Sequence, residues 1–298
     1  MSGVKQTVVY SPSQFEQLCS ENPGMAFMGY LGDKTEDEWD ESTSRRYMNK
    51  LWESFAYIPI QLKQAEASLY LNSYYKVAES AGNIIGFNHT NPHKSNPAMR
   101  AMYGGGEGDI LIKSEGKLQI ADCNGRAAVM LLSHLISERP FSDYTLVIIG
   151  GLGATGRLIL NAFADTAPKD ILICDIQAND VFIDSLEAKM GFRPRYIDDI
   201  AKIPEIAGPA MFVNATRHAD ARKGISILSI LERCDIKGNA ALDLIMGSDE
   251  SFGSLAMRTA DGNEFAAWTN YLLTQLIEQA VPGLDHIGQE AFRKLALL

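Results

Sequence analysis

The sequence places a lysine and an aspartate where two predicted β-strands end. Lys94 closes the polar segment 86–94, which follows an apolar pair, and Asp122 ends the strand-like segment 118–122. In a cleft shielded from water, opposite charges keep each other ionised, and such a lysine can relay a proton. Many lysines and aspartates at strand ends are instead solvated surface residues. Spacing alone therefore leaves both a proton-transfer pair and a surface location open.

A glycine-rich segment has the form of a dinucleotide-binding turn. Three glycines in a GxGxxG arrangement follow the apolar segment 144–149 and precede a segment with helical spacing, 157–164. In such a turn the first glycine permits the tight bend, the second lets the backbone approach a pyrophosphate, and the third lets the helix pack closely. Free N–H groups at the helix start would bind the phosphates, although a plain strand–turn–helix remains the alternative. The predicted contacts are Gly151, Gly153, Ala154, Thr155 and Gly156.

An acidic residue follows the next predicted strand. Asp175 ends the segment 170–175, about twenty residues beyond the glycines, where an acid accepts hydrogen bonds from the adenosine ribose. A carboxylate there repels a 2′-phosphate, and residues 176–179 contain no arginine. The segment therefore favours NAD over NADP, unless Asp175 is only a strand-end acid.

Two further strand ends point to the same cleft. Segment 210–213 leads to Asn214 and Thr216, and segment 240–245 leads to Met246. Ligands of open parallel sheets bind beyond the carboxyl ends of the strands, so these residues are expected to contact the nicotinamide part of the cofactor. Asp243, within the second segment, could equally be structural.

Two serines precede a segment with helical spacing, 45–55. Ser42 and Ser44 could cap that helix. They could also bind a carboxylate, because a helix N-terminus offers unpaired N–H groups and a favourable dipole. The sequence leaves both roles open.

Composition limits the class of protein. The chain has 298 residues and a net charge of −10, which argues against nucleic acids and anionic membranes as partners and favours a small molecule. The four cysteines form no CxxC pair, so we expect neither a metal site nor a disulfide framework. No apolar segment approaches membrane-spanning length, and the N-terminus lacks a signal-peptide core. We therefore expect a soluble, cytoplasmic protein, either a monomer or a homodimer.

Several of these segments together resemble the shikimate dehydrogenase family, which includes the quinate dehydrogenases. Residues 86–94, Gly-Phe-Asn-His-Thr-Asn-Pro-His-Lys, are similar to the family's G-x-N-V-T-x-P-x-K, and residues 121–125 to the end of its N-T-D-G-x-G. Residues 42–49 look like S-L-S-P-x-x-H-N, residues 213–216 match I-N-A-T, and residues 271–275 resemble M-L-V-x-Q. The resemblance covers most of the chain after residue 24.

The resemblance implies an NAD- or NADP-dependent interconversion of alcohol and ketone on a small cyclic hydroxy acid. Lys94 would relay the proton of the reacting hydroxyl while hydride moves to the nicotinamide, and Asp122 would orient that hydroxyl. The implied substrate contacts are Ser42, Ser44, Asn88, Thr90, Asp109 and Gln275.

The predicted fold is α/β with two domains. Residues 1–122 are expected to form an α/β substrate-binding domain, with residues 1–23 as a packing extension that carries no chemistry. Residues 123–265 are expected to form a Rossmann-type, doubly wound parallel sheet that binds NAD. Residues 266–298 should fold back onto the first domain.

Departures from the family motifs concern the substrate. Asp109 stands where a substrate-binding asparagine is expected, Met246 where a tyrosine is expected, and Arg217 where a serine is common. His89 replaces a usually aliphatic residue and either packs behind the pocket or lines it. Exchanging a carboxamide for a carboxylate removes a donor and adds charge, which suits a cationic or donor-rich substrate group. These departures suggest an altered substrate choice.

Two other functions fit the same sequence. A methylene-tetrahydrofolate-type dehydrogenase has a comparable two-domain plan, but it needs a slot for a pterin, which the two serines do not suggest. A non-catalytic, metabolite-sensing relative would have no need for both Lys94 and Asp122.

Overall fold

The chain divides into two compact units. In the computed structural model, unit 1 comprises Met1–Cys123 and Asn270–Leu298, and unit 2 comprises Asn124–Thr269. The boundary lies close to the expected one after residue 122. The structure describes residues 2–40, 42–94, 96–103, 108–136, 139–199, 202–204, 206, 208–216, 240–244 and 258–289.

Unit 1 is built on a five-stranded mixed sheet with the order β2-β1-β3-β4-β5. Strands β1, β2 and β3 are parallel, whereas β4 pairs antiparallel with both β3 and β5. Strand β5 therefore runs in the same direction as β3. The strands are β1 (Ala26–Gly32), β2 (Phe55–Gln61), β3 (Ile84–His89), β4 (Ile110–Ser114) and β5 (Lys117–Ala121).

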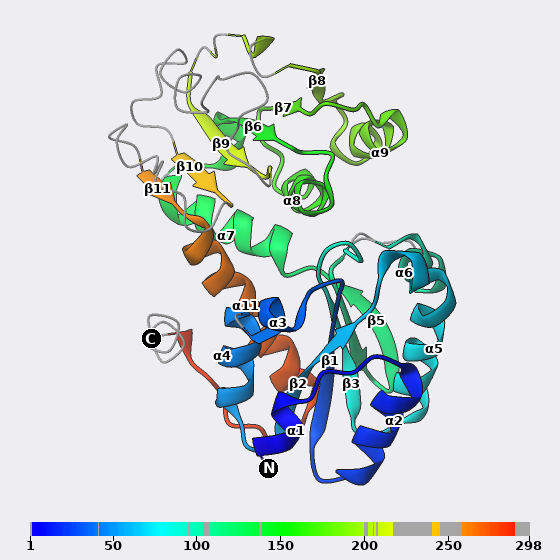
Figure 1. The fold of residues 1–298 in the computed structure, drawn as a ribbon. Helices are drawn as coiled ribbons and strands as arrows, with labels where there is room; N and C mark the ends of the chain where they lie inside the picture. The colour runs from blue at the N-terminus through cyan, green and yellow to red at the C-terminus, as the bar shows by residue number, and fades with distance from the viewer. Residues whose placement is uncertain are drawn as a thin grey trace. The chain divides into compact units, whose positions relative to one another are not determined.

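Helices cover both faces of this sheet (Figure 1). On one face the buried ring of Phe87 lies 5.9 Å from Phe15 of α2 and 5.6 Å from Tyr75 of α5, measured between ring centroids. On the other face helix α4 lies against β2. The backbone N–H of Tyr57 in β2 donates to the Asn49 side chain of α4 at 2.7 Å. The helices of unit 1 are α1 (Ser2–Gln6), α2 (Pro12–Glu21), α3 (Glu36–Asp40), α4 (Thr43–Leu51), the 3-10 turn η1 (Gln64–Glu66), α5 (Ala67–Ser80) and α6 (Pro97–Met102).

The N-terminal segment packs against α4 and β2. Val9 pairs with β2 through a single parallel bridge to Ile60. Helix α1 precedes it, and the Lys5 ammonium donates to the carbonyls of Asn49 and Trp52, at 2.8 and 2.6 Å. A cation at a helix C-terminus satisfies carbonyls that have no partner in the helix. The segment therefore secures the end of α4.

The helix expected over residues 45–55 is shorter than its apolar spacing suggested. Helix α4 ends at Leu51, Trp52 is extended, and Phe55 begins β2. Trp52 and Phe55 are buried and pack edge to face with centroids 5.6 Å apart. The chain turns into the sheet at these two residues, and both side chains become buried there. In the sequence this produces the same spacing of apolar residues as one more helical turn would.

Unit 2 is a parallel sheet with the order β11-β10-β9-β6-β7-β8. The chain order reverses between β6 and β9, as in a doubly wound sheet, so the predicted fold class is confirmed. Helix α7 contacts α8, β10 and β11. The elements are α7 (Asn124–Ile136), the 3-10 turn η2 (Phe141–Asp143), β6 (Thr145–Ile149), α8 (Ala154–Ala164), β7 (Asp170–Cys174), α9 (Asp180–Met190), β8 (Arg195–Ile197), β9 (Ala210–Asn214), β10 (Ala240–Asp243) and β11 (Arg258–Ala260).

Helix α11 (Gly262–Ala280) begins in unit 2 and continues into unit 1. In unit 1, Leu273 and Thr274 are fully buried, and the Thr274 hydroxyl lies 3.8 Å from the sulfur of Met48 in α4. Among the described helices, none is both long enough and apolar enough to cross a membrane.

Candidate functional site

The predicted catalytic residues of unit 1 lie at one edge of its sheet. Because β3 and β5 run in the same direction, the chain leaves both at the same edge and enters antiparallel β4 between them. Lys94 follows β3, Asp109 precedes β4, and Asp122 follows β5. Lys94 and Asp122 are half-buried, and Asp109 is buried. Topology therefore brings the proposed proton-transfer residues to one place.

The segment that carries Lys94 is fixed to the neighbouring strands. The Thr90 backbone N–H donates to the carbonyl of Leu31 in β1 at 2.8 Å. The buried His93 lies with Nε2 2.6 Å from the carbonyl oxygen of Leu62. A carbonyl oxygen can only accept, so Nε2 carries the proton, and burial lowers the pKa of this imidazole. These contacts hold the backbone on either side of Thr90.

Asn88 contacts a tyrosine that sequence reasoning missed. The Asn88 side-chain N–H donates to the Tyr57 hydroxyl at 2.6 Å. The Tyr57 ring stacks on Tyr30 with centroids 4.9 Å apart. Desolvation, with smaller effects from Tyr30 and Asp109, raises the pKa of Tyr57 well above its ordinary value, so the phenol stays neutral. The strand register is the observation that identifies this contact, since it places Tyr57 and Asn88 on the same face of the sheet as Tyr30.

Asp109 is held by both main-chain and side-chain contacts. Its carboxylate accepts the backbone N–H of Cys123, next to Asp122, at 3.1 Å. Its backbone carbonyl accepts the N–H of His89 at 2.7 Å and lies 3.1 Å from His89 Nδ1. Only 2% of Asp109 is exposed. The expected substrate-contact position therefore sits between the ends of β3 and β5.

His89 packs inside unit 1 and does not line a surface. Its side chain is completely buried, and Nε2 lies 2.9 Å from the Tyr75 hydroxyl of α5. Of the two roles left open by the sequence, the structure supports packing behind the site. Burial lowers the pKa of His89 to about 4, so the imidazole is neutral at neutral pH.

Ser42 is the N-cap of α4, and its hydroxyl oxygen accepts the backbone N–H of Arg45 at 3.4 Å. The capping role is therefore confirmed. A hydroxyl that accepts this bond still has its own proton to donate, so binding of a carboxylate by Ser42 and Ser44 stays compatible with the cap. Both serines are half-buried in the first turn of the helix or directly before it.

Gln275 lies on the part of α11 that belongs to unit 1. Its side-chain N–H donates to the hydroxyl of Tyr271, one helical turn earlier, at 2.9 Å. The side chain is half-buried. Its predicted contact with substrate stays a prediction.

In unit 2 the glycine turn joins β6 to α8, at the point where the strand order reverses. The tight bend is made by Gly150, with a φ of +74°, and not by Gly151 as the motif suggested. A Cβ on Gly156 would collide with the backbone oxygen of Gly150 and lie 2.6 Å from the Cα of Gly151. Gly153 is exposed and caps α8 without a side chain, and its own N–H donates to the Gly150 carbonyl at 3.2 Å, so a phosphate at this turn would meet the N–H groups that follow it.

Asp175 is connected to the glycine turn. Its Oδ2 accepts the backbone N–H of Leu152 at 2.8 Å, and Oδ1 accepts the N–H of Ile176 at 2.7 Å. Each carboxylate oxygen can accept a further bond. The acid predicted for the ribose therefore lies at the turn predicted for the pyrophosphate.

Asn214 joins the ends of two strands. Its side-chain N–H donates to Asp243 at 3.0 Å, and its oxygen accepts the Thr216 hydroxyl at 2.7 Å. Asn214 is 1% exposed, whereas Thr216 is half-buried. The Asn214 amide is thus occupied between β9 and β10. Met246 and Arg217 lie outside the described residues.

Comparisons with known proteins identify the fold. No family model matches this sequence, and no curated protein matches it. A solved shikimate dehydrogenase in complex with NADP+ is 16% identical, with a TM-score of 0.69 and coverage of 93% of this chain and 96% of that one. Quinate dehydrogenase from Corynebacterium glutamicum in complex with NAD is 14% identical, with a TM-score of 0.69 and coverage of 92% and 99%. This chain has the shikimate dehydrogenase fold.

The same fold is found in an enzyme named for a different substrate. Ligand-free 5-ketofructose reductase of Gluconobacter sp. strain CHM43 is 16% identical, with a TM-score of 0.64 and coverage of 92% of this chain and 98% of that one. Each match spans nearly all of both chains, so both units take part in it. Within the shikimate dehydrogenase fold, the substrate must be inferred from the side chains of the site.

We expect His89 to make the protein less stable in acid. The unfolded chain takes up a proton near pH 6.5, whereas the folded imidazole does so only near pH 4. Stability from this group is therefore complete above pH 6.5 and is lost at about 1.4 kcal/mol per pH unit as the pH falls, approaching about 3 kcal/mol. Urea denaturation of wild type and His89→Gln at pH 7 and pH 5 measures the difference. The exposed His134, changed to Gln, is the matched control; an unchanged pH dependence in His89→Gln contradicts the prediction.

We expect the two glycines of the turn to separate folding from binding. Gly156→Ala should lower the thermal midpoint by about 4 °C or more, because its Cβ meets backbone. Gly153→Ala should fold normally, since the nearest atom lies 3.3 Å from its Cβ, and should instead weaken NAD binding. Thermal unfolding and calorimetric titration with NAD measure both effects. Equal midpoints for the two variants would show that the close helix packing is unimportant.

Proposed function

We propose that this protein is an NAD-dependent oxidoreductase that interconverts alcohol and ketone on a shikimate- or quinate-like cyclic hydroxy acid. The proposal is supported by strand directions that put the segments carrying Lys94 and Asp122 at the same sheet edge, in a fold shared with dehydrogenases solved with NADP+ or NAD. Retention of both residues favours catalysis over metabolite sensing.

In this proposal the residues of unit 1 handle the proton. Lys94 relays the proton of the reacting hydroxyl to solvent, its neutral amine taking that proton as hydride leaves the carbon for the nicotinamide, and Asp122 orients that hydroxyl. The bound nicotinamide supplies the hydride chemistry. Ser42 and Ser44 bind the substrate carboxylate at the start of α4, with Asn88, Thr90 and Gln275 as further contacts. Correct placement of these groups accounts for much of the rate.

The glycine turn and Asp175 would hold the cofactor. Ala154 and Thr155 present the first N–H groups of α8 to the pyrophosphate, Gly153 lets the backbone approach it, and Asp175 accepts from the ribose hydroxyls. Thr216 and Met246 would contact the nicotinamide side. Gly151 and Gly156 keep the turn closely packed, as their short Cβ contacts indicate.

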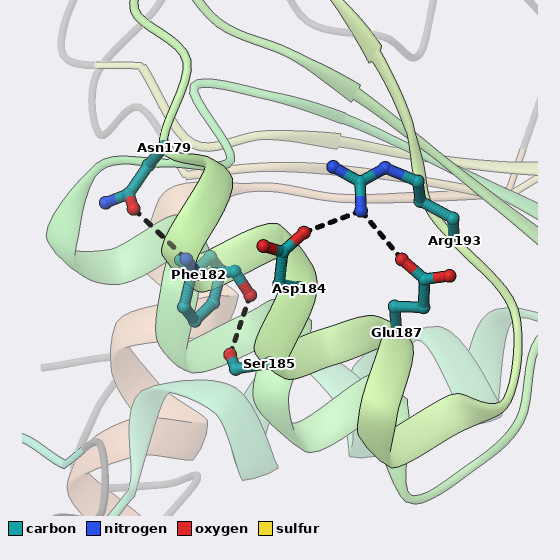
Figure 2. A network of polar contacts seen from close by, with 6 residues as sticks. All are labelled: Asn179, Phe182, Asp184, Ser185, Glu187 and Arg193. Atoms are coloured by element: carbon teal, nitrogen blue, oxygen red, sulfur yellow. Dashed lines mark hydrogen bonds and ion pairs between the residues drawn. The ribbon is translucent and has the colours of Figure 1, made fainter.

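The charges around α9 favour NAD over NADP. Arg193 donates to Asp184 at 2.6 Å and to Glu187 at 2.7 Å, on the side of α9 away from its N-cap Asn179 (Figure 2). Arg195 pairs with Asp170 at 2.6 Å, at the start of β7, whereas Asp175 follows its end. Both arginines are thus occupied away from Asp175, and a 2′-phosphate there would meet a carboxylate.

Asp109 favours a substrate that differs from shikimate. A carboxylate accepts hydrogen bonds only, whereas the asparagine expected at this position also donates. Because this carboxylate is buried, a ligand group that is itself an acceptor would lie beside it without a hydrogen bond, at a cost in binding free energy. We therefore propose a ring carrying an amino group or several hydroxyl donors opposite Asp109.

Lys94→Ala tests the proposed reaction. Cyclic hydroxy acids are screened with NAD by absorbance of NADH, and the variant should lose about 100- to 10,000-fold in kcat while NAD still binds. Lys117→Ala, an exposed lysine at the start of β5, is the matched control and should retain activity. A fully active Lys94→Ala protein would falsify the mechanism. Measurable ligand binding without NADH from any acid would favour the sensor instead.

Asp175→Asn tests the cofactor preference. The amide removes the charge that disfavours a 2′-phosphate, so the ratio of the NADP to the NAD dissociation constant should fall by about tenfold. Calorimetric titration of both nucleotides into wild type and variant gives this ratio. Tighter binding of NADP by the wild type would contradict the assignment of NAD.

A further inference from the structure

We propose that His89, held by Tyr75, is a positioning residue that fixes Asp109 and, through it, the Cys123 amide beside the catalytic Asp122. The inference deepens the proposed function, and its effect on turnover rests on that function. Three groups are linked by hydrogen bonds: the Tyr75 hydroxyl, the His89 ring and the Asp109 carbonyl. They act on the backbone beside Asp122.

Hydrogen-bond chemistry determines which nitrogen of His89 carries the proton. Nδ1 lies 3.1 Å from the backbone oxygen of Asp109, which can only accept, so Nδ1 is the donor. Burial keeps the ring neutral, and a neutral imidazole has one N–H, so Nε2 is an acceptor. The Tyr75 hydroxyl, 2.9 Å away, therefore donates to Nε2. The chain of donors runs in one direction, from Tyr75 through His89 to Asp109.

This chain fixes a residue that links three strands. The Asp109 carbonyl oxygen accepts both the backbone N–H and the ring N–H of His89, so each of its two lone pairs points at one of these donors. The Asp109 N–H donates to the carbonyl of Ala121 in β5 at 3.2 Å, and its carboxylate accepts from Cys123 at 3.1 Å. Rotation of the Asp109 peptide would move the carboxylate and the backbone on either side of Asp122 together.

The surroundings of His89 indicate that its ring has a directional hydrogen-bonding role in addition to packing. The ring is packed among aromatic side chains, 5.9 Å from Tyr75 and 6.5 Å from Phe87 between centroids. A polar pair in such a core has a desolvation cost that hydrogen bonds offset only when their geometry is satisfied. An aliphatic side chain would fill the space without that cost. What the imidazole adds is a fixed donor aimed at Asp109.

The Asp109 charge also acts on the face of the sheet that carries Tyr57 and Asn88. It is one of the causes that raise the pKa of Tyr57, whose hydroxyl accepts from Asn88. Fixing Asp109 therefore also fixes the field that acts on the Tyr57–Asn88 pair. The expected consequence of loosening His89 is weaker substrate binding as well as slower turnover.

Helix α5 supplies a matched pair of variants. Tyr75→Phe removes the hydroxyl that holds His89, whereas Tyr74→Phe removes a buried hydroxyl that has no hydrogen-bond partner among the described residues. Both rings pack on Phe87, so the two changes are alike in size and burial. Tyr75→Phe should lower kcat/KM by about 10- to 100-fold with an increase in KM, and Tyr74→Phe should stay within about twofold of wild type.

Variants at His89 itself test the direction of the donor. His89→Asn places a side-chain N–H near the position of Nδ1 and should retain more activity than His89→Leu, which offers no donor. Circular dichroism and thermal unfolding of each variant separate loss of fold from loss of position. Equal activities for the Asn and Leu variants, both folded, would overturn the inference.

Two measurements test the positioning without relying on turnover. Nitrogen-15 NMR of histidine at pH 7 should show His89 with a protonated Nδ1 and an unprotonated Nε2. Hydrogen exchange at the Cys123 amide should be faster in Tyr75→Phe than in Tyr74→Phe. If the wild type oxidises no cyclic hydroxy acid, the proposed function fails while these readings still decide the positioning. A protonated Nε2, or equal exchange in the two variants, would overturn the inference even in an active enzyme.

Discussion

The direction of the strands is the constraint on which the rest of the structure depends. In unit 1, β1, β2, β3 and β5 run the same way, so the residues that follow them gather at one edge, with the start of β4 between. In the described part of unit 2 the strands pair in parallel, the glycine turn follows β6, and Asn214 ends the adjacent strand β9. A sheet of this kind brings together residues that are far apart in sequence, without needing any attraction between them.

Buried polar groups then hold the segments at each sheet edge in position. His93 and Asn214 occupy their hydrogen-bonding atoms with backbone or neighbouring side chains. Leaving such a group without a partner would cost about 1–3 kcal/mol, so each contact penalises movement of the segment it holds. Asp175 acts in the same way on the glycine turn, since its carboxylate accepts the backbone N–H of Leu152.

The sequence predicted what depends on local pattern. The parallel sheet, the glycine turn in its strand–helix context and the Ser42 cap each follow from residues close together in the chain. The end of α4 was wrong because Trp52 and Phe55 fit a helical period while turning into β2. The bend at Gly150 was assigned to its neighbour because the motif counts glycines and carries no information on φ. Tyr57 and Tyr75 were missed because their roles depend on partners in other strands and helices.

Two departures from the family motif that looked independent in the sequence are in contact in the structure. His89 stands where an aliphatic residue is usual and Asp109 where an asparagine is expected, and the ring of the first donates to the carbonyl of the second. An aliphatic residue at position 89 would remove the ring bond to that carbonyl, and Tyr75 would lose the acceptor for its hydroxyl. Changing either residue alone therefore disturbs the other. Tyr75, His89 and Asp109 therefore form one hydrogen-bonded unit that reaches from α5 through β3 to the backbone beside Asp122.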